Sequence, residues 1–135
     1  MLPETIYPEW TDDEICRLQD RWKIAGVLAV RLVCMANRLP FRIQIISGFR
    51  TREHQERLIR EGMGAPVELS THCSCPATGA DLRCVLAVTD IVRATFGEAA
   101  TACGLRWGGG SPPDPDTGIP LDWNHVDLGP RTANR

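Results

Sequence analysis

Two of the three histidines in the chain lie in short polar segments that also contain carboxylates. Eight residues separate His72 from Asp81, and His125 lies three residues after Asp122. Two imidazoles and one carboxylate would leave one of the four usual coordination positions of zinc open. This is typical of a catalytic site, whereas structural zinc is usually held by four protein ligands. The residue types therefore predict a zinc-dependent hydrolase.

The residues around His125 indicate how water could be activated. If 123–128 form a strand, Trp123, His125 and Asp127 share one face of it. Asp122 then lies at the start of the strand, where its carboxylate could accept a proton from metal-bound water. Zinc lowers the pKa of such water toward neutrality, and a general base completes the activation. A lone histidine on a strand is usually a packed or solvated residue, so the prediction depends on the second histidine with its own carboxylate.

The spacing of His72 and Asp81 is a weaker signal, because eight intervening residues match neither a helical nor a strand period. We expect a loop at 65–78, where prolines occur and no hydrophobic period is found. A loop that doubles back could bring the two side chains together. Gly79 would allow a close backbone approach just before Asp81.

The composition is that of a globular protein with one core. The chain has 135 residues, of which 43% are apolar and 24% are charged. Its formal charge is −2 and its basic residues are not clustered, so nucleic acid is not an expected partner. We expect one monomeric domain over residues 1–135, with a helical part at about 11–38 and a motif-bearing part at about 43–128.

The amino-terminal segment shows no secretory signal, because residues 1–10 have neither a basic start nor an apolar run. The longest apolar stretch, at 24–35, is interrupted by Arg31 and is too short to span a bilayer. We therefore expect synthesis in the cytoplasm and no membrane partner. The six cysteines are expected to be reduced thiols, because structural disulfides are typical of secreted chains.

Hydrophobic patterns predict an α+β fold on a small, mainly antiparallel sheet flanked by helices. Thr11 and Glu14 form a capping box, and apolar residues behind it recur at steps of three and four. This helical stripe consists of Ile15, Leu18, Trp22, Ala25, Ala29, Leu32 and Ala36. Helices interspersed with short strands, without regular alternation, favour this fold class. We expect helices at 11–37, 51–61 and 88–103, strands at 41–46, 80–85, 105–107 and 123–128, and an exposed loop at 111–120.

Several short motifs follow one another along the chain. They are Ser-Gly-Phe-Arg-Thr at 47–51, Ser-x-His with Gly-Ala-Asp within 70–81, Trp-Gly-Gly at 107–109 and Asp-x-x-His at 122–125. Together they resemble the motifs of LAS-type zinc peptidases, which include D-alanyl-D-alanine carboxypeptidases and phage L-alanyl-D-glutamate endolysins. The resemblance covers residues 43–128. It implies a fold shared with the Hedgehog signalling domain and peptidoglycan stem peptides as substrate. The lack of a secretory signal at 1–10 favours a phage lytic enzyme that acts in the cell wall after phage-mediated release, or a cytosolic dipeptidase.

The resemblance makes His72, Asp81 and His125 the zinc ligands. The segment between the first two is two residues longer than is usual in the family, and it contains Cys73 and Cys75. Such an insertion can bulge outward at little entropic cost. It could instead bring one of the two thiols to the metal as a further ligand.

The resemblance also implies roles outside the ligand set. Asp122 becomes the general base, and Arg50 corresponds to an arginine that stabilises the developing oxyanion or holds a substrate carboxylate. Ser70 corresponds to a serine that contacts substrate. The cleaved bond stays open between that of an endopeptidase and that of a D,D-carboxypeptidase. The alternative hypothesis is a catalytically silent, metal-stabilised structural or binding module, such as a virion component, whose closed site would include a cysteine.

Overall fold

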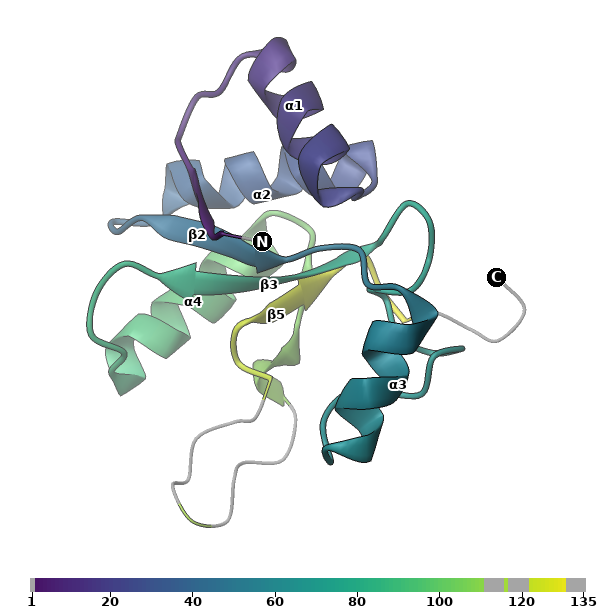
Figure 1. The fold of residues 1–135 in the computed structure, drawn as a ribbon. Coiled ribbons are helices and arrows are strands. Elements are labelled where there is room, and N and C mark those ends of the chain that lie inside the picture. Colours follow the sequence, from purple (N-terminus) through teal and green to yellow (C-terminus); the bar gives the residue numbers. More distant parts are fainter. Residues whose placement is uncertain (1, 111–115, 117–121, 131–135) are drawn as a thin grey trace.

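The structure, a computed structural model, describes residues 2–110, 116 and 122–130, and its fold is drawn in Figure 1. Five strands form one sheet in the order β1-β2-β3-β5-β4, and every neighbouring pair is antiparallel. The strands are β1 (Glu4–Ile6), β2 (Ile43–Ser47), β3 (Gly79–Cys84), β4 (Arg106–Trp107) and β5 (His125–Asp127). The helices are α1 (Asp12–Trp22), α2 (Gly26–Arg38), α3 (Arg52–Arg60), α4 (Asp90–Ala102) and the short 3-10 helix η1 (Gly108–Gly110). The predicted α+β class is confirmed.

The helices are distributed unevenly around the sheet. α1 packs against α2, and α2 also contacts β1 and α4. α3 stands apart from the other three α-helices, near the end of β2 (Figure 1). Among the described residues, no helix is long and apolar enough to cross a membrane.

The first predicted helix is in fact two helices, so the continuous helix expected at 11–37 is wrong. The capping box is present, with the Glu14 N–H donating to Thr11 Oγ1 (3.4 Å) and the Thr11 N–H to the Glu14 carboxylate (3.1 Å). α1 ends at Trp22 and is capped by Lys23, whose φ of 54° is left-handed. Beyond it the chain pairs with Ala77: the Ala77 N–H donates to Lys23 O (2.9 Å) and the Ala25 N–H to Ala77 O (2.8 Å). The backbone hydrogen bonds made at this break therefore hold the loop that precedes β3.

The apolar core lies between the sheet and helices α1, α2 and α4. Its largest fully buried apolar side chains come from all of these elements: Ile6, Leu18, Ile24, Leu28, Leu32, Met35, Ile43, Ile45, Leu82, Phe96 and Val126. Burial stabilises by roughly 1.5–3 kcal/mol for a large aliphatic or aromatic side chain. This packing fixes β2, β3 and β5, whose other positions carry the candidate site.

The remaining element predictions agree with the structure to within a few residues. The strands expected at 41–46, 80–85, 105–107 and 123–128 correspond to β2, β3, β4 and β5, and the helices expected at 51–61 and 88–103 to α3 and α4. Strand β1 has no counterpart among the predictions, because three residues between prolines show too little alternation to be recognised. Of the loop expected at 111–120, all positions except Asp116 lie outside the described residues.

Candidate metal centre and cleft

The three predicted ligands come together. Ligand atoms of His72, Asp81 and His125 all lie within 4.8 Å of one another, and they form a group able to hold a metal ion. Oδ1 of Asp81 lies 3.3 Å from Nε2 of His72 and 3.0 Å from Nδ1 of His125. The two imidazole rings are tilted at 51° with centroids 5.2 Å apart. Two imidazoles therefore flank one carboxylate, an arrangement of donors that could hold a metal ion.

Backbone groups hold His72 at its ring and at its own carbonyl. Its Nδ1 lies 2.7 Å from Gly48 O, and because a carbonyl only accepts, this nitrogen carries the proton and Nε2 faces Asp81. The Arg50 N–H donates to His72 O (2.8 Å). A Cβ at Gly48 would lie 2.5 Å from Trp22 O. Only glycine lets the chain pass so close to α1, and that approach brings the carbonyl to the ring.

Asp81 lies on β3, opposite Ser47 of β2 on one side and His125 of β5 on the other. A register irregularity just before Ser47 offsets the strands there. Burial by itself raises the pKa of Asp81, but hydrogen bonds from His125 and His72, together with their charges, outweigh it. The pKa of this carboxyl therefore lies far below its usual range. Asp81 is ionised, as a metal ligand must be.

His125 has a carboxylate at each ring nitrogen. Nδ1 faces Asp81, and Nε2 lies 2.8 Å from Oδ2 of Asp127 and 3.4 Å from Thr71 Oγ1. Burial lowers the pKa of His125, but the hydrogen bonds to Asp127 and Asp81 and their charges raise it more, to about 9. The two carboxylates thus favour the protonated ring, and a metal ion bound at Nδ1 would take the place of a proton.

Arg50 binds the metal-site carboxylate directly. Its Nη2 donates to Oδ2 of Asp81 (2.6 Å), while Nε donates to Ser47 Oγ (3.1 Å) and Nη1 to Gln55 Oε1 (3.3 Å). Gln55 is fully buried and donates in turn to Ala65 O (2.8 Å). Arg50 also lines the cleft described below. It therefore orients Asp81 and presents positive charge to the cleft at the same time.

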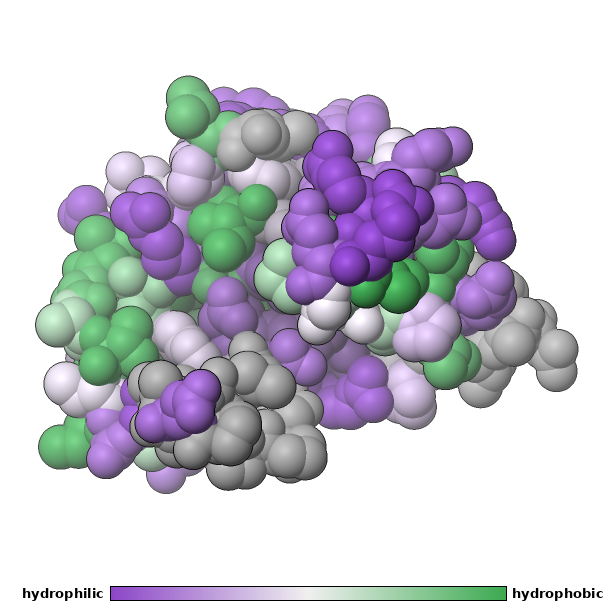
Figure 2. Space-filling model, turned by 60° about the horizontal axis from the view of Figure 1, so that its bottom comes forward, coloured by the Kyte–Doolittle hydropathy of each residue, from purple (hydrophilic) through white to green (hydrophobic). Residues whose placement is uncertain are grey.

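The ligand group opens onto a cleft of about 950 Å³. The other predicted site residues, Arg50, Ser70 and Asp122, line this cleft as well. Asp122 is exposed, and its carbonyl accepts a hydrogen bond from the His125 N–H (2.9 Å), which ties it to the last ligand. Figure 2, which turns this side of the molecule forward, shows hydrophilic side chains gathered around a hollow.

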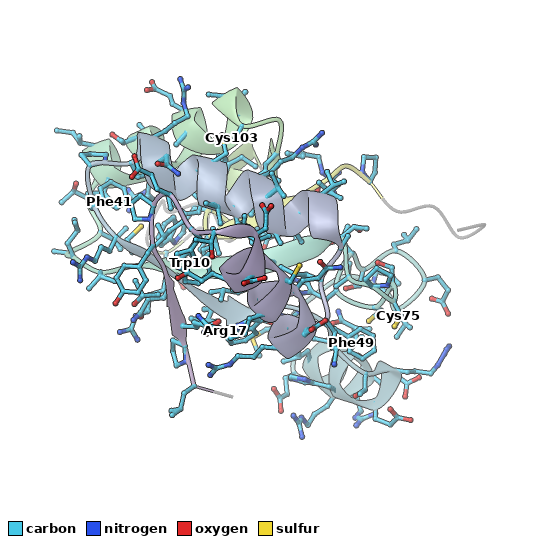
Figure 3. The ribbon with its side chains drawn as sticks, turned by 90° about the horizontal axis from the view of Figure 1, so that it is seen from above. Trp10, Arg17, Phe41, Phe49, Cys75 and Cys103 are labelled. Carbon is cyan, nitrogen blue, oxygen red and sulfur yellow. The ribbon has the colours of Figure 1, made fainter. Side chains whose placement is uncertain are left out.

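Neither cysteine of the longer loop joins the ligand group found among the described residues. Cys73 is half-buried and donates its N–H to Ser70 O (3.1 Å), and Cys75 is exposed. In Figure 3 Cys75 lies in a loop at the outer edge of the molecule, far from Cys103. His72, which directly precedes Cys73, belongs to the ligand group.

Two charged residues of the site were given no role by the sequence reasoning. Asp127 is fully buried behind His125, and both of its carboxylate oxygens accept hydrogen bonds from Arg106 (2.8 and 2.7 Å). The alternation of β5 already places Asp127 on the same face as His125, so the sequence contained a signal that Asp127 belongs to the site. The pairing with Arg106 depends on the register of β4 and β5, which no local pattern reveals.

Comparisons with known proteins support the fold. No protein-family model matches the sequence, and no curated protein matches it. Among solved structures, the L-Ala D-Glu endopeptidase ChiX of Serratia marcescens matches with a TM-score of 0.59 and 17% sequence identity. The alignment covers 87% of this chain and 85% of that chain. At this identity the likeness shows a shared fold, which confirms the predicted peptidase-like α+β architecture.

Proposed function

We propose that this chain is a zinc-dependent peptidase of the LAS type that hydrolyses peptide bonds in the stem peptides of peptidoglycan. One observation carries the proposal: His72, Asp81 and His125 converge at an open cleft, on a fold shared with an L-Ala D-Glu endopeptidase. Imidazole and carboxylate donors in this number suit zinc and leave a coordination position for the reaction. The proposed unit is a monomeric domain of residues 1–135 that acts in the cell wall after release.

The protein side of the mechanism begins with Asp122. When bound, zinc supplies a Lewis acid that polarises the scissile carbonyl and lowers the pKa of the attacking water. Asp122 lines the cleft beside His125. Its carboxylate accepts a proton from the attacking water and passes it to the leaving amine, which is general base and then general acid catalysis.

Arg50 and Ser70 would act on the substrate. Three nitrogens of Arg50 each donate to a protein acceptor, and a guanidinium has five N–H donors. Within the described part of the chain, two N–H groups are therefore left for a ligand in the cleft. A fixed positive charge there would stabilise a developing oxyanion or hold a substrate carboxylate. Ser70 accepts a hydrogen bond from the His72 N–H (3.3 Å) and lines the cleft. We assign it to substrate contact.

The cleaved bond is proposed to be internal to the peptide. The structural neighbour is an endopeptidase by name, and the cleft has an apolar wall of Leu58, Met63 and Leu69 in addition to its charged groups. Met63 and Leu69 are about half exposed, at 51% and 48%. An endopeptidase needs such contacts on both sides of the bond, whereas a D,D-carboxypeptidase closes one end around a free carboxylate. The latter is our second candidate.

A closed structural site is the competing hypothesis, and it requires a fourth protein ligand. The group found among the described residues contains three ligands and no sulfur, and it faces a cleft. This arrangement favours an enzyme over a metal-stabilised binding module.

The experiment is digestion of purified peptidoglycan, with release of amino groups as the readout and mass spectrometry of the products to identify the bond. We expect new amino termini with the zinc-loaded protein. Asp122→Ala should bind zinc as before and lose at least about 100-fold in rate, the usual contribution of a general base. The control is Asp20→Ala, an exposed aspartate of α1. Full activity of Asp122→Ala would overturn the general-base assignment, and a wild-type protein without activity would overturn the proposal.

A further inference from the structure

Asp127 is a buried carboxylate that the proposed mechanism does not use. Its side chain is 0% exposed and lies on β5 two residues after His125. It accepts four hydrogen bonds, from the His125 ring, from two nitrogens of Arg106 and from the Gly129 N–H (2.9 Å). A buried charge is tolerated only with partners of this kind. The number and geometry of these bonds show a carboxylate held in one orientation.

The orientation of Asp127 matters because of the nitrogen that it contacts. Nδ1 of His125 faces Asp81 in the ligand group, whereas Nε2 faces Asp127. A carboxylate only accepts hydrogen bonds, so a neutral His125 beside Asp127 carries its proton on Nε2. The lone pair is then on Nδ1, the nitrogen directed at the ligand group. A carboxylate behind a ligand histidine fixes the ring and increases its basicity in this way.

Arg106 holds Asp127 in turn. The two residues are paired across β4 and β5, and the guanidinium binds the carboxylate through two parallel hydrogen bonds. Bidentate pairs of this kind are geometrically specific. The side chain of Arg106 is 52% exposed, so it can be replaced with less disturbance of the interior than Asp127.

We infer that Asp127, held by Arg106, is a positioning residue that fixes the ring and tautomer of His125 for metal binding. The inference rests on the proposed function, because it concerns a partner of a proposed zinc ligand. The inference adds a requirement beyond the three ligands themselves. His125 can bind the metal through Nδ1 only when its Nε2 donates to a carboxylate.

The test is the zinc dissociation constant of Asp127→Asn, measured by competition with a chromophoric chelator at one pH. Nε of Arg106 and the Gly129 N–H both donate to Oδ1 of Asp127, so the amide oxygen of the new residue is favoured at that position and its NH₂ faces Nε2 of His125. This favours the wrong tautomer of His125, so we expect affinity to fall by about 10- to 100-fold. Asp90→Asn is the matched control, because it breaks a surface ion pair with Arg93 and should leave the affinity unchanged.

Two further measurements separate positioning from a general structural role. In the zinc-loaded wild type, ¹⁵N NMR of the imidazoles should show His125 protonated at Nε2, and Arg106→Gln should weaken zinc binding several-fold. If circular dichroism shows that Asp127→Asn does not fold, the zinc affinity of Arg106→Gln tests the inference instead. Unchanged zinc affinity in the folded variants, with normal binding by the wild type, would overturn this inference alone. A wild type that binds no zinc would overturn the proposed function as well.

Discussion

The apolar core and the metal centre are built on the same strands, but they bury opposite kinds of side chains. Ile45 of β2 and Leu82 of β3 are fully buried in the core, and the paired residues Ser47 and Asp81 lie next to them on the same two strands, at the candidate site. In the core, neighbours contribute through buried area, which depends little on direction. At the site, His72, Asp81 and Asp127 each have a partner at a defined atom, because a buried polar group without one is destabilising.

Because of this difference, the stability of the fold and the activity of the site should depend on different residues. A core side chain should be replaceable by another of similar volume, since packing tolerates such exchanges at modest cost. A site residue such as Asp81, with Arg50 on one oxygen and two histidines on the other, has no isosteric substitute that keeps all three contacts. We therefore expect core variants to lower stability and site variants to lower activity.

The largest effect is expected for His125→Ala. Without one of three ligands the site should lose zinc, and peptidoglycan hydrolysis should fall by at least about 1000-fold, because metal and water activation are lost together. Thermal unfolding should show that the variant remains folded. His54→Ala is the control, since His54 lies on α3 outside the ligand group. Retention of zinc and activity by His125→Ala would contradict the ligand assignment.

The core counterpart is Leu32→Ala on α2, a fully buried position. It should reduce the free energy of unfolding by about 2–5 kcal/mol, because it removes buried methyl groups and leaves a cavity. Urea denaturation measures this, and activity per folded molecule should stay unchanged. Val30 is on the same helix but 54% exposed, and Val30→Ala should change stability by less than about 0.5 kcal/mol. Equal effects of the two substitutions would show that the helix face is misassigned.

Gly79→Ala probes the boundary between the two regions. A Cβ there would lie 2.0 Å from Thr71 Oγ1 and 3.0 Å from His125 Cε1. We expect about 1–3 kcal/mol of destabilisation from overpacking and weaker zinc binding in the same variant, because the clash displaces a ligand. At Gly26, the start of α2, an added Cβ meets nothing closer than 3.4 Å. Gly26→Ala should therefore leave zinc binding unchanged and should not destabilise the protein, and a neutral Gly79→Ala would contradict the close packing of the loop on β3.

Cysteine alkylation gives the smallest expected difference. Burial raises the pKa of Cys84 to about 11, and burial followed by contact with Cys34 raises that of Cys103 to about 12. Since the thiolate is the reactive form, both should react at least about tenfold more slowly with iodoacetamide at pH 8 than the exposed Cys16 and Cys75. Peptide mass spectrometry resolves the sites. Uniform rates would mean that the core opens readily.

Periodicity and caps predicted the core better than the site. The stripe through Leu18 and Leu32 placed residues that the structure buries, and the capping box at Thr11 is present. The helix break at Lys23 could not be predicted, because it depends on backbone pairing with Ala77, more than 50 residues away in sequence. Patterns of three or four residues report which face is buried, but they do not report a distant partner.

The site was predicted through its residue types, and its geometry was not. Convergence of His72 and Asp81 required a loop that returns to β3, and spacing alone could only allow it. The contact between Arg50 and Asp81, and the placement of Asp127 behind His125, follow from strand register and rotamers. These are determined by the whole fold, so no local segment contains them.

The central claim is tested most directly by titrating metal-free protein with zinc while measuring amino-group release from peptidoglycan in the same samples. We predict that activity rises with bound zinc, reaches its maximum at about one zinc per chain as expected of a single three-ligand site, and disappears when a chelator is added. Stoichiometric zinc binding without any release from peptidoglycan, or release that does not depend on metal, would contradict it.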